Sequence, residues 1–385
     1  MTIFKHAILT TACVAAVAAG LTACGSSSES GTSTSTASSA VPTKPATKPA
    51  RLVIRVWSGD EQVVYEETAA KAFTAATGIP IKWDTTDEAV SYAKINQQIA
   101  SGDRPSADAS LNAQQRAYTN AARGWTVPIN PALAPNMAKV TTSTARPVDT
   151  TSASWPYLIP YTLSVPFIVR TDKIDPSKVQ TWDDLFKPDL AKGLVLDSIY
   201  SSTAFGFAGS MGVDPAKGAP SSMDPVWSRI AKLKPNLAQL GSNADVVTAL
   251  TNGTVKVAIS NIGSGISAKA AGAPVKMVAP KNGLYVVGDA YYIHKGIPAE
   301  NAYYAQVFAN YLLDPTVQSA VAAKLGFVPV NPAATVPKYM SDDPKVFPRS
   351  EADLKAVGAI LAPIPLMAKN DAPWQKAFEN AIGGG

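Results

Sequence analysis

Residues 51–83 read RLVIRVWSGDEQVVYEETAAKAFTAATGIPIKW, and two patterns alternate along them. Leu52 to Trp57 is an apolar run typical of a buried strand, and it stops at Ser58-Gly59-Asp60. Apolar residues then recur at helical spacing up to Thr77-Gly78, where glycine suits a helix end. Ile79 to Trp83 reads as a second strand. Strand–helix–strand order predicts a parallel sheet covered by helices.

The alternation continues, with a helix expected over Glu88–Ala100, a strand over Ala107–Leu111 and a helix over Gln114–Ala122. A second α/β unit follows, with strands expected at 165–169, 194–196, 255–259, 276–279 and 285–287 and helices at 301–313, 315–325, 350–361 and 374–382. The chain has 385 residues, more than one hydrophobic core usually fills, so two lobes are expected.

Polar residues follow several of these strands. In parallel sheets a ligand binds beyond the carboxyl ends of the strands. Ser58, Gly59 and Asp60 follow the first strand, and Asn112 and Gln114 follow the third. We therefore expect these five residues to line a binding site.

The first 25 residues have the order of an export signal. Lys5 gives a weakly basic start, Ala7 to Ala19 is almost wholly apolar, and Leu21-Thr22-Ala23 precedes Cys24. The apolar run is shorter than the roughly 20 residues that a membrane-spanning helix needs. A cysteine after Leu-Thr-Ala resembles the lipobox of bacterial lipoproteins. Residues 1–23 are thus predicted to be a signal peptide, and Cys24 to carry lipid.

Residues 24–50 are rich in Ser, Thr and Pro and are predicted to form a disordered tether. The protein is expected outside the cytoplasm, lipid-anchored to a membrane, in the periplasm or on the outer face of the cell membrane. The net charge of +5 is too small to indicate nucleic acid. Cys13 lies in the signal, so the mature chain cannot form an internal disulfide. We expect a monomer without a cofactor.

Short motifs occur along most of residues 51–340, and they are Phe73 with Thr77-Gly78-Ile79, Tyr92-Ala93-Lys94, Ile159-Pro160-Tyr161, Thr181–Pro188, Pro280–Gly283 with Asp289, and Tyr311–Pro315 with Gly326–Asn331. In this order they resemble the bacterial extracellular solute-binding proteins of the spermidine/putrescine-binding type. The resemblance implies the two-lobed periplasmic-binding-protein fold of type II, an α/β fold in which each lobe is a mixed sheet flanked by helices and crossing strands join the lobes. Residues 51–160 plus 289–335 would form lobe 1, 161–288 lobe 2, and 336–385 C-terminal helices packing across the lobes.

The resemblance also implies a function and a partner. The protein would be the substrate-binding lipoprotein of an ABC importer, without catalysis, and would deliver a small polar solute to a membrane permease with ATPase subunits. Asp289 sits where polyamine binders keep an aspartate that pairs with a ligand amine. Val287 and Ser260 stand where those proteins keep stacking tryptophans, and Ser202 stands where they keep an acid. A buried ammonium needs such groups, so long polyamines are disfavoured.

The run Ser201-Ser202-Thr203 is expected at the start of a helix. Hydroxyls and free backbone N–H groups there suit either a simple cap or an anion site. Facing Asp289, this run would fit a zwitterion such as an aminophosphonate or an amino-acid-like solute; a polyamine-like amine or a neutral sugar also stays open. The expected solute contacts are Ser58, Gly59, Asp60, Asn112, Gln114, Tyr161, Ser201, Ser202, Thr203, Ser260, Asn261 and Asp289.

Parts of the sequence also suggest two other functions, a ferric-ion binder and an exported serine hydrolase. A ferric-ion binder could use Tyr291-Tyr292 and His294, but neighbouring strand residues point to opposite faces. An exported serine hydrolase could use Ser210, in Ala208-Gly209-Ser210-Met211-Gly212, with His294 and Asp289. Ser210 falls late in a helical stretch, whereas a nucleophile elbow needs a strand-to-helix turn.

Overall fold

The computed structural model describes residues 41–148, 150–281 and 283–383. The predicted signal peptide, Cys24 and most of the predicted tether lie outside these residues. Lys48 Nζ already donates a hydrogen bond to the Thr77 carbonyl at 2.6 Å, and Pro49 is buried. The chain therefore contacts the folded body slightly before Arg51. Among the described residues, no helix combines the length and the apolar character that a membrane crossing requires.

The first sheet has the strand order β12-β5-β11-β3-β1-β2, and β4 and β13 also pair with β11. Its strands are β1 (Leu52–Arg55), β2 (Ile81–Asp84), β3 (Ala109–Ala113), β4 (Thr126–Val127), β5 (Tyr161–Val165), β11 (Tyr285–His294), β12 (Val328–Pro329) and β13 (Ile360–Leu361). As predicted, β1 pairs in parallel with β2, and it also pairs in parallel with β3. Its helices are α1 (Asp60–Tyr65), α2 (Lys71–Thr77), α3 (Glu88–Ser101), α4 (Gln114–Ala122), α9 (Ala299–Leu312) and α10 (Pro315–Leu325).

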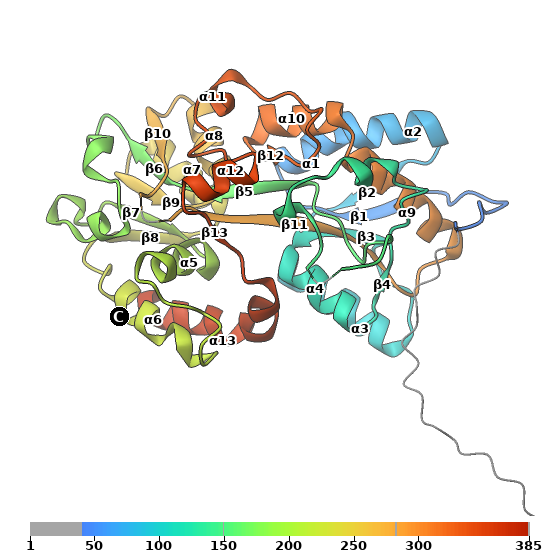
Figure 1. Cartoon of the computed structure of the whole chain (residues 1–385), viewed down its shortest axis with the longest axis horizontal. Coiled ribbons are helices and arrows are strands. Elements are labelled where there is room, and N and C mark those ends of the chain that lie inside the picture. Colours follow the sequence, from blue (N-terminus) through green and yellow to red (C-terminus); the bar gives the residue numbers. More distant parts are fainter. Residues whose placement is uncertain (1–40, 149, 282, 384–385) are drawn as a thin grey trace, which may run out of the picture. The chain divides into compact units, whose positions relative to one another are not determined.

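Helices cover both faces of this sheet (Figure 1). On one face the Tyr291 hydroxyl donates to the carbonyl of Ala305 in α9 at 3.0 Å. On the other face Tyr292 packs with Ala117 of α4. The helix ends follow capping residues. Asp87 accepts from the first backbone N–H groups of α3, and Gly102 closes that helix at φ 78°.

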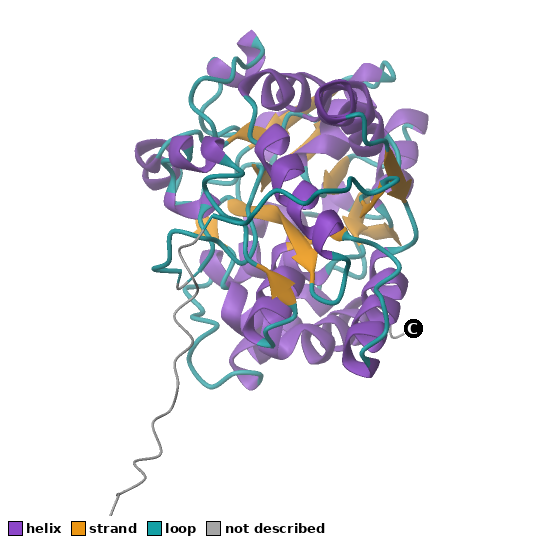
Figure 2. Ribbon diagram, turned by 90° about the vertical axis from the view of Figure 1, so that its right-hand side faces the viewer, coloured by secondary structure: helices purple, strands orange, loops and turns teal. Residues whose placement is uncertain are grey.

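The second sheet has the order β10-β6-β9-β7-β8. Its strands are β6 (Phe167–Arg170), β7 (Leu194–Asp197), β8 (Leu237–Gly241), β9 (Val257–Ile259) and β10 (Val275–Val278). Strand β7 is parallel to both β8 and β9, whereas β6 is antiparallel to β9 and β10, so the sheet is mixed. Its helices are α5 (Tyr200–Ser210), α6 (Asp224–Ala231), α7 (Asn243–Asn252) and α8 (Ile262–Ala270). Figure 2 shows helices, in purple, on the outside of the strands, in orange.

Two strands connect the sheets. Strand β5 continues into β6 after the single residue Pro166. Residues 285–288 of β11 pair with β5, and residues 289–293 pair with β3. The expected pair of mixed, helix-flanked sheets joined by crossing strands is therefore confirmed. Of the expected lobe limits, 160/161 lies directly before β5 and 288/289 lies within β11.

The C-terminal segment contains α11 (Lys338–Ser341), α12 (Glu351–Ala356) and α13 (Ile364–Gly383). Helix α13 packs against α5 and α6 of the second sheet and against α4 of the first. The expected helix over 350–361 was wrong in its second half. Gly358 has φ 59°, and Ile360–Leu361 then pair with β11 as β13.

Candidate functional site

Asp289 lies on β11 at the carboxyl end of β3, opposite Ala113. Its Oδ2 accepts hydrogen bonds from Trp57 Nε1 at 3.0 Å and from the Tyr161 hydroxyl at 2.9 Å. Within the described residues its other oxygen, Oδ1, accepts no hydrogen bond. Burial raises the pKa of Asp289, and the two hydrogen bonds offset this only in part. The carboxylate is thus fixed through one oxygen while the other can accept a solute proton.

Glu61, which the sequence did not single out, shares a partner with Asp289. The Tyr161 hydroxyl contacts Glu61 Oε1 at 2.8 Å as well as Asp289. Glu61 is buried, and burial together with the charge of Asp289 raises its pKa well above the ordinary value. One hydroxyl carries one proton, so the two neighbouring carboxyl groups compete for it; Asp289 keeps the Trp57 N–H in either case, whereas Glu61 has no second donor among the described residues. A cationic solute would supply the missing protons.

The buried Arg55 packs against Trp57, the indole that donates to Asp289. The Arg55 guanidinium lies over the Trp57 ring at 4.3 Å, and it donates to the Leu111 carbonyl at 3.1 Å and to Asn112 Oδ1. Asn112 Nδ2 donates to the Tyr292 hydroxyl at 3.0 Å. Asn112 is fully buried and both ends of its amide are occupied, so it holds Arg55 in place and presents no atom to a solute.

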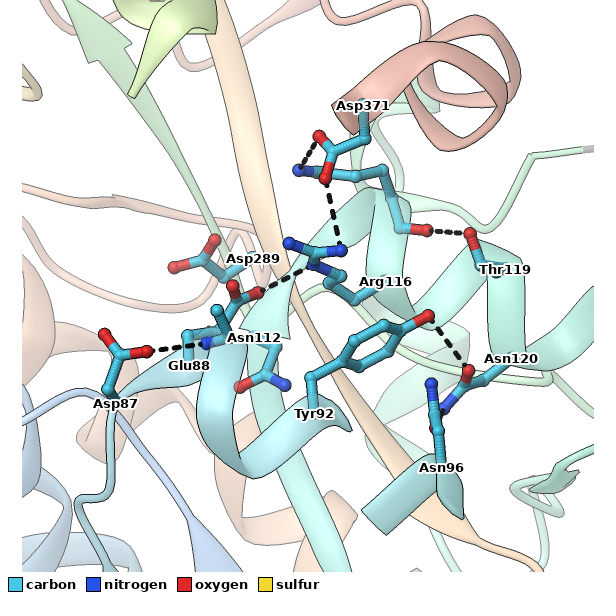
Figure 3. Close-up of polar contacts among 12 residues, drawn as sticks. Asp87, Glu88, Tyr92, Asn96, Asn112, Arg116, Thr119, Asn120, Asp289 and Asp371 are labelled. Carbon is cyan, nitrogen blue, oxygen red and sulfur yellow. Dashed lines mark hydrogen bonds and ion pairs between the residues drawn. The ribbon is translucent and has the colours of Figure 1, made fainter. Parts of the chain in front are cut away.

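Further along the same edge, Arg116 lies between two acids (Figure 3). Its Nε is 3.5 Å from Glu88 Oε1, and its Nη1 is 3.2 Å from Asp371 Oδ2. Gln115 Nε2 donates to Asp371 Oδ1 at 3.4 Å. Burial raises the pKa of Glu88 although Arg116 is close.

These groups interact electrostatically and carry an excess of acid. They are Glu61, Glu88, Asp289, Asp371, Arg55 and Arg116. Four carboxyl groups face two guanidinium groups, and burial raises the pKa of Glu61, Glu88 and Asp289. Burial is the largest cause of each rise, so the raised values show that ionisation of these carboxyl groups is disfavoured and that Arg55 and Arg116 offset this only in part. A positive charge is the missing component.

The second sheet contributes an acid that the sequence reading also missed. Asp197 ends β7 and is 1% exposed. It accepts from Ile199 N at 2.8 Å, from Ser202 Oγ at 3.2 Å and from Ser260 Oγ at 3.4 Å. Burial raises its pKa to about 6. The sequence feature that could have identified Asp197 is its place directly after the apolar run Leu194–Leu196.

The run Ser201–Thr203 does not cap a helix, which corrects that expectation. Helix α5 begins at Tyr200, with Ile199 at the cap position, so the three residues lie inside the first turn and are buried. The Ser202 hydroxyl is occupied by the carboxylate of Asp197. Negative charge therefore already sits where the anion was expected, and a second anion would be repelled.

The remaining expected contacts lie at separate places. Ser58 and Gly59 are exposed, and Gly59 has φ 86°, a conformation that favours glycine. Both oxygens of Asp60 have partners outside the Asp289 cluster. Its Oδ1 is 3.1 Å from Lys324 Nζ in α10, and its Oδ2 accepts from Ser267 Oγ in α8 at 3.3 Å. Elsewhere, Ser260 Oγ also lies 3.1 Å from Asn243 Oδ1, which shares its single proton with Asp197, and Asn261 stands at the cap of α8.

A cavity of about 160 Å³, which we name the β11 cavity, is lined by β11 residues that directly precede Asp289. It is lined by Gln114, Ser143, Thr144, Arg146, Val148, Val286, Val287, Gly288, Leu361, Ala362 and Ile364. Gln114 follows Ala113, the strand partner of Asp289, and Gly288 precedes Asp289. Among the described residues, Arg146 is the single charged side chain in this lining.

The residues of the ferric alternative have other partners. Tyr291 and Tyr292 bond on opposite faces of β11, and burial raises the pKa of both phenols, which disfavours tyrosinate. His294 is buried, and its Nε2 lies 2.8 Å from Ser110 Oγ. Within the described ranges no three His, Cys, Asp or Glu side chains gather as a metal site would require.

The hydrolase alternative also lacks its geometry. Ser210 is the last residue of α5, and its hydroxyl donates to the Phe207 carbonyl at 2.9 Å. His294 and Asp289 each bond to other groups. Burial lowers the pKa of His294 to about 3, so it would be a poor base at neutral pH.

Two helix-flanked sheets, crossing strands and polar groups at the strand ends are the architecture of the two-lobed periplasmic binding proteins. Residues 68–348 match the family of bacterial extracellular solute-binding proteins. The chain belongs to this family, whose members are binding proteins and not enzymes.

A curated relative is the spermidine/putrescine-binding periplasmic protein of Escherichia coli K12, which is 30% identical over 199 residues, 51% of this chain and 56% of that protein. The chain thus spans about half the length of the curated relatives it matches. A Streptococcus pneumoniae spermidine/putrescine ABC transporter substrate-binding protein has a TM-score of 0.68 at 16% identity, covering 86% of this chain and 98% of that one. The periplasmic binding protein AfuA of Actinobacillus pleuropneumoniae, with fructose-6-phosphate bound, has a TM-score of 0.66 at 20% identity, with 86% and 98% covered. These similarities confirm the periplasmic-binding-protein fold.

Proposed function

We propose that this protein is the substrate-binding lipoprotein of an ABC importer and that it captures a small amine-bearing solute. The observation that carries the proposal is the acid excess around Asp289. One oxygen of Asp289 is saturated by Trp57 and Tyr161, and Glu61 competes for the same hydroxyl. An ammonium group would donate to the open oxygen and neutralise the excess.

The surroundings favour a short solute over a long polyamine. The Arg55 guanidinium covers a face of the Trp57 ring, and the indole presents its N–H to Asp289. Ser260 is buried and bonded to Asp197, Asn243 and Ser264, so it offers no stacking surface. An alkyl chain carrying several ammonium groups would find no open aromatic face here.

Delivery would follow the usual logic of this fold. Strands β5 and β11 are the crossing strands, and small rotations about them would open and close the lobes on the solute. The closed, loaded protein would then present both lobes to a membrane permease driven by ATPase subunits. A lipid at Cys24 would keep the protein near that permease.

The binding proposal predicts that Asp289→Asn weakens an amine-bearing ligand by roughly ten- to hundredfold, because a charge-assisted hydrogen bond contributes about 1.5–3 kcal/mol. A thermal-shift screen of amines, amino acids, aminophosphonates and sugars would supply the ligand, and titration calorimetry would measure its affinity. Asp183→Asn, at a carboxylate whose side chain is 74% exposed, is the control. Equal affinities for all three proteins would refute the amine site.

The anchoring proposal predicts that cells fed a labelled fatty acid transfer the label to this protein, and that Cys24→Ser abolishes the transfer. The membrane fraction should then lose the protein to the soluble extracytoplasmic fraction. Undiminished labelling of the Cys24→Ser protein would show that the anchor lies elsewhere or is absent.

A further inference from the structure

The β11 cavity adds a positively charged side chain, Arg146, to a site that is otherwise rich in acids. We propose that the solute is a short zwitterion whose ammonium group binds Asp289 and whose acidic group binds Arg146 in the β11 cavity. This inference rests on the proposed amine site and goes further, because it names the other end of the solute and the residue that selects it.

Position links the cavity to Asp289. Side chains alternate along a strand, so Val287 and Asp289 project from the same face of β11. Val287 and Gly288 line the cavity, as does Gln114, which follows the strand partner of Asp289. A solute held by the open oxygen of Asp289 can therefore extend past Val287 into the cavity.

Arg146 has the chemistry of an anion receptor. Its Nη2 donates to the Val140 carbonyl at 3.1 Å, and it forms no ion pair with any residue in 41–148, 150–281 or 283–383. A guanidinium group presents further N–H groups in a planar fork that matches a carboxylate or phosphonate. A cation that lines a cavity and has no counter-ion among the described residues is a natural partner for an acidic solute group.

The segment that carries Arg146 is held in place. Both the backbone N–H and the hydroxyl of Ser143 donate to Glu351 Oε1, at 2.8 and 2.7 Å. Ala145, directly before Arg146, is fully buried. These contacts, with the Val140 hydrogen bond, orient the guanidinium before a solute arrives, which reduces the entropy that binding must overcome.

The size of the cavity limits the length of the solute. A cavity of about 150 Å³ accommodates benzene, which has six carbons, and the β11 cavity measures about 160 Å³. Its walls include Val148, Val287, Leu361 and Ile364, which suit methylene groups. A linear amino acid of four to six carbons in all, with three to five methylene groups between its charged ends, fits this space.

The second sheet does not offer an equivalent anion site. The Ser202 hydroxyl and the backbone N–H of Ile199, the cap residue of α5, already donate to Asp197, and the N–H of Tyr200 donates to Gln375. An acidic solute group placed there would meet a carboxylate, so the Arg146 side is favoured.

Matched pairs of probes test the inference by titration calorimetry. The pairs are 4-aminobutanoate with 1,4-diaminobutane, and the five- and six-carbon homologues of each. We expect at least one amino acid to bind roughly tenfold or more tightly than its diamine. Arg146→Ala should weaken that amino acid at least tenfold and leave the diamine unchanged, and Arg146→Lys should fall between, because it keeps charge but loses the fork.

Arg123→Ala is the matched control, since it removes an exposed arginine that stacks on Trp125 and does not line the cavity. Unchanged melting temperatures would show that both variants fold. Diamines that bind more tightly than amino acids, or an Arg146→Ala protein with unaltered amino-acid affinity, would overturn the inference and leave the amine site standing. Failure of both series to bind wild-type protein would overturn the inference and count against the amine site itself.

Discussion

Asp197 faces conflicting physical demands. Three hydrogen-bond donors, Ile199 N and the hydroxyls of Ser202 and Ser260, favour its ionised form. Complete burial favours the neutral form and prevails, so the pKa rises to about 6 from an ordinary value of 3.8. The folded state therefore binds this proton more tightly than the unfolded chain does.

The sign of the pH dependence follows. A raised folded-state pKa on an acid means that stability is fully present below pH 3.8 and is lost as pH rises towards 6. The shift of about 2 units corresponds to roughly 3 kcal/mol above pH 6. We expect Asp197→Asn, which keeps an acceptor oxygen, to be more stable than wild type at pH 7, with the gain vanishing below pH 4. Urea unfolding at several pH values measures the difference in unfolding free energy between the two proteins. A difference that does not change with pH would contradict this account.

At the same scale, the sequence indicated only part of the site. Asp289 and Tyr161 were among the expected contacts, and both lie in the hydrogen-bonded cluster. Glu61, Asp197 and Arg146 were missed because their roles depend on burial by distant segments. Tyr161 contacts Glu61 across 100 positions of sequence, and no local pattern reports such a contact. Arg146 lies in a stretch without periodicity, so only the cavity revealed it.

At the scale of elements, strong local signals were reliable. Helix α4 occupies the expected 114–122. The expected strand at 165–169 covers parts of two strands, because Pro166 lacks the N–H that a continuous ladder needs. Strand β8 was missed because it lies at a sheet edge and is only partly buried, which weakens the alternation. Helix α7 could have been found from its capping box, Ser242 with Asp245, and its closing Gly253.

Helix α13 connects the lobes through one side chain. Asp371 pairs with Arg116 of α4, and its Oδ1 also lies 3.5 Å from the Tyr200 hydroxyl of α5. Nearby, Gln375 accepts from Tyr200 N at 3.2 Å and donates to the Ser198 carbonyl at 3.0 Å. The helix therefore contacts the first turns of α4 and α5 together.

Asp371→Asn should loosen this connection, because Arg116 would keep only Glu88 as a charged partner. We expect a loss of about 1 kcal/mol in unfolding free energy and faster amide hydrogen exchange in α13 and at the start of α4. Lys369→Gln, an exposed change on the same helix, is the control. Exchange rates equal to those of wild type would show that the ion pair does not hold α13.

At the scale of the whole molecule, the lobes also meet away from the acid cluster. Asp60 of α1 bonds to Ser267 of α8, so a residue expected to touch solute instead joins helices of different sheets. Gly326, after α10, lies so close to α8 that an added Cβ would sit 2.7 Å from Ile266. The resemblance to solute-binding proteins predicted two lobes, but which side chains join them followed only from the three-dimensional packing.

Strand β11 is shared by the crossing region and the site, since residues 285–288 pair with β5 and residues 289–293 with β3. Inserting or deleting one residue before Asp289 would turn its carboxylate towards the opposite face and misalign one ladder at the same time. Solute specificity can therefore change in evolution through the side chains at 287 and 289, but not through a change in the length of this stretch. Homologues that have diverged in what they carry should align across it without gaps.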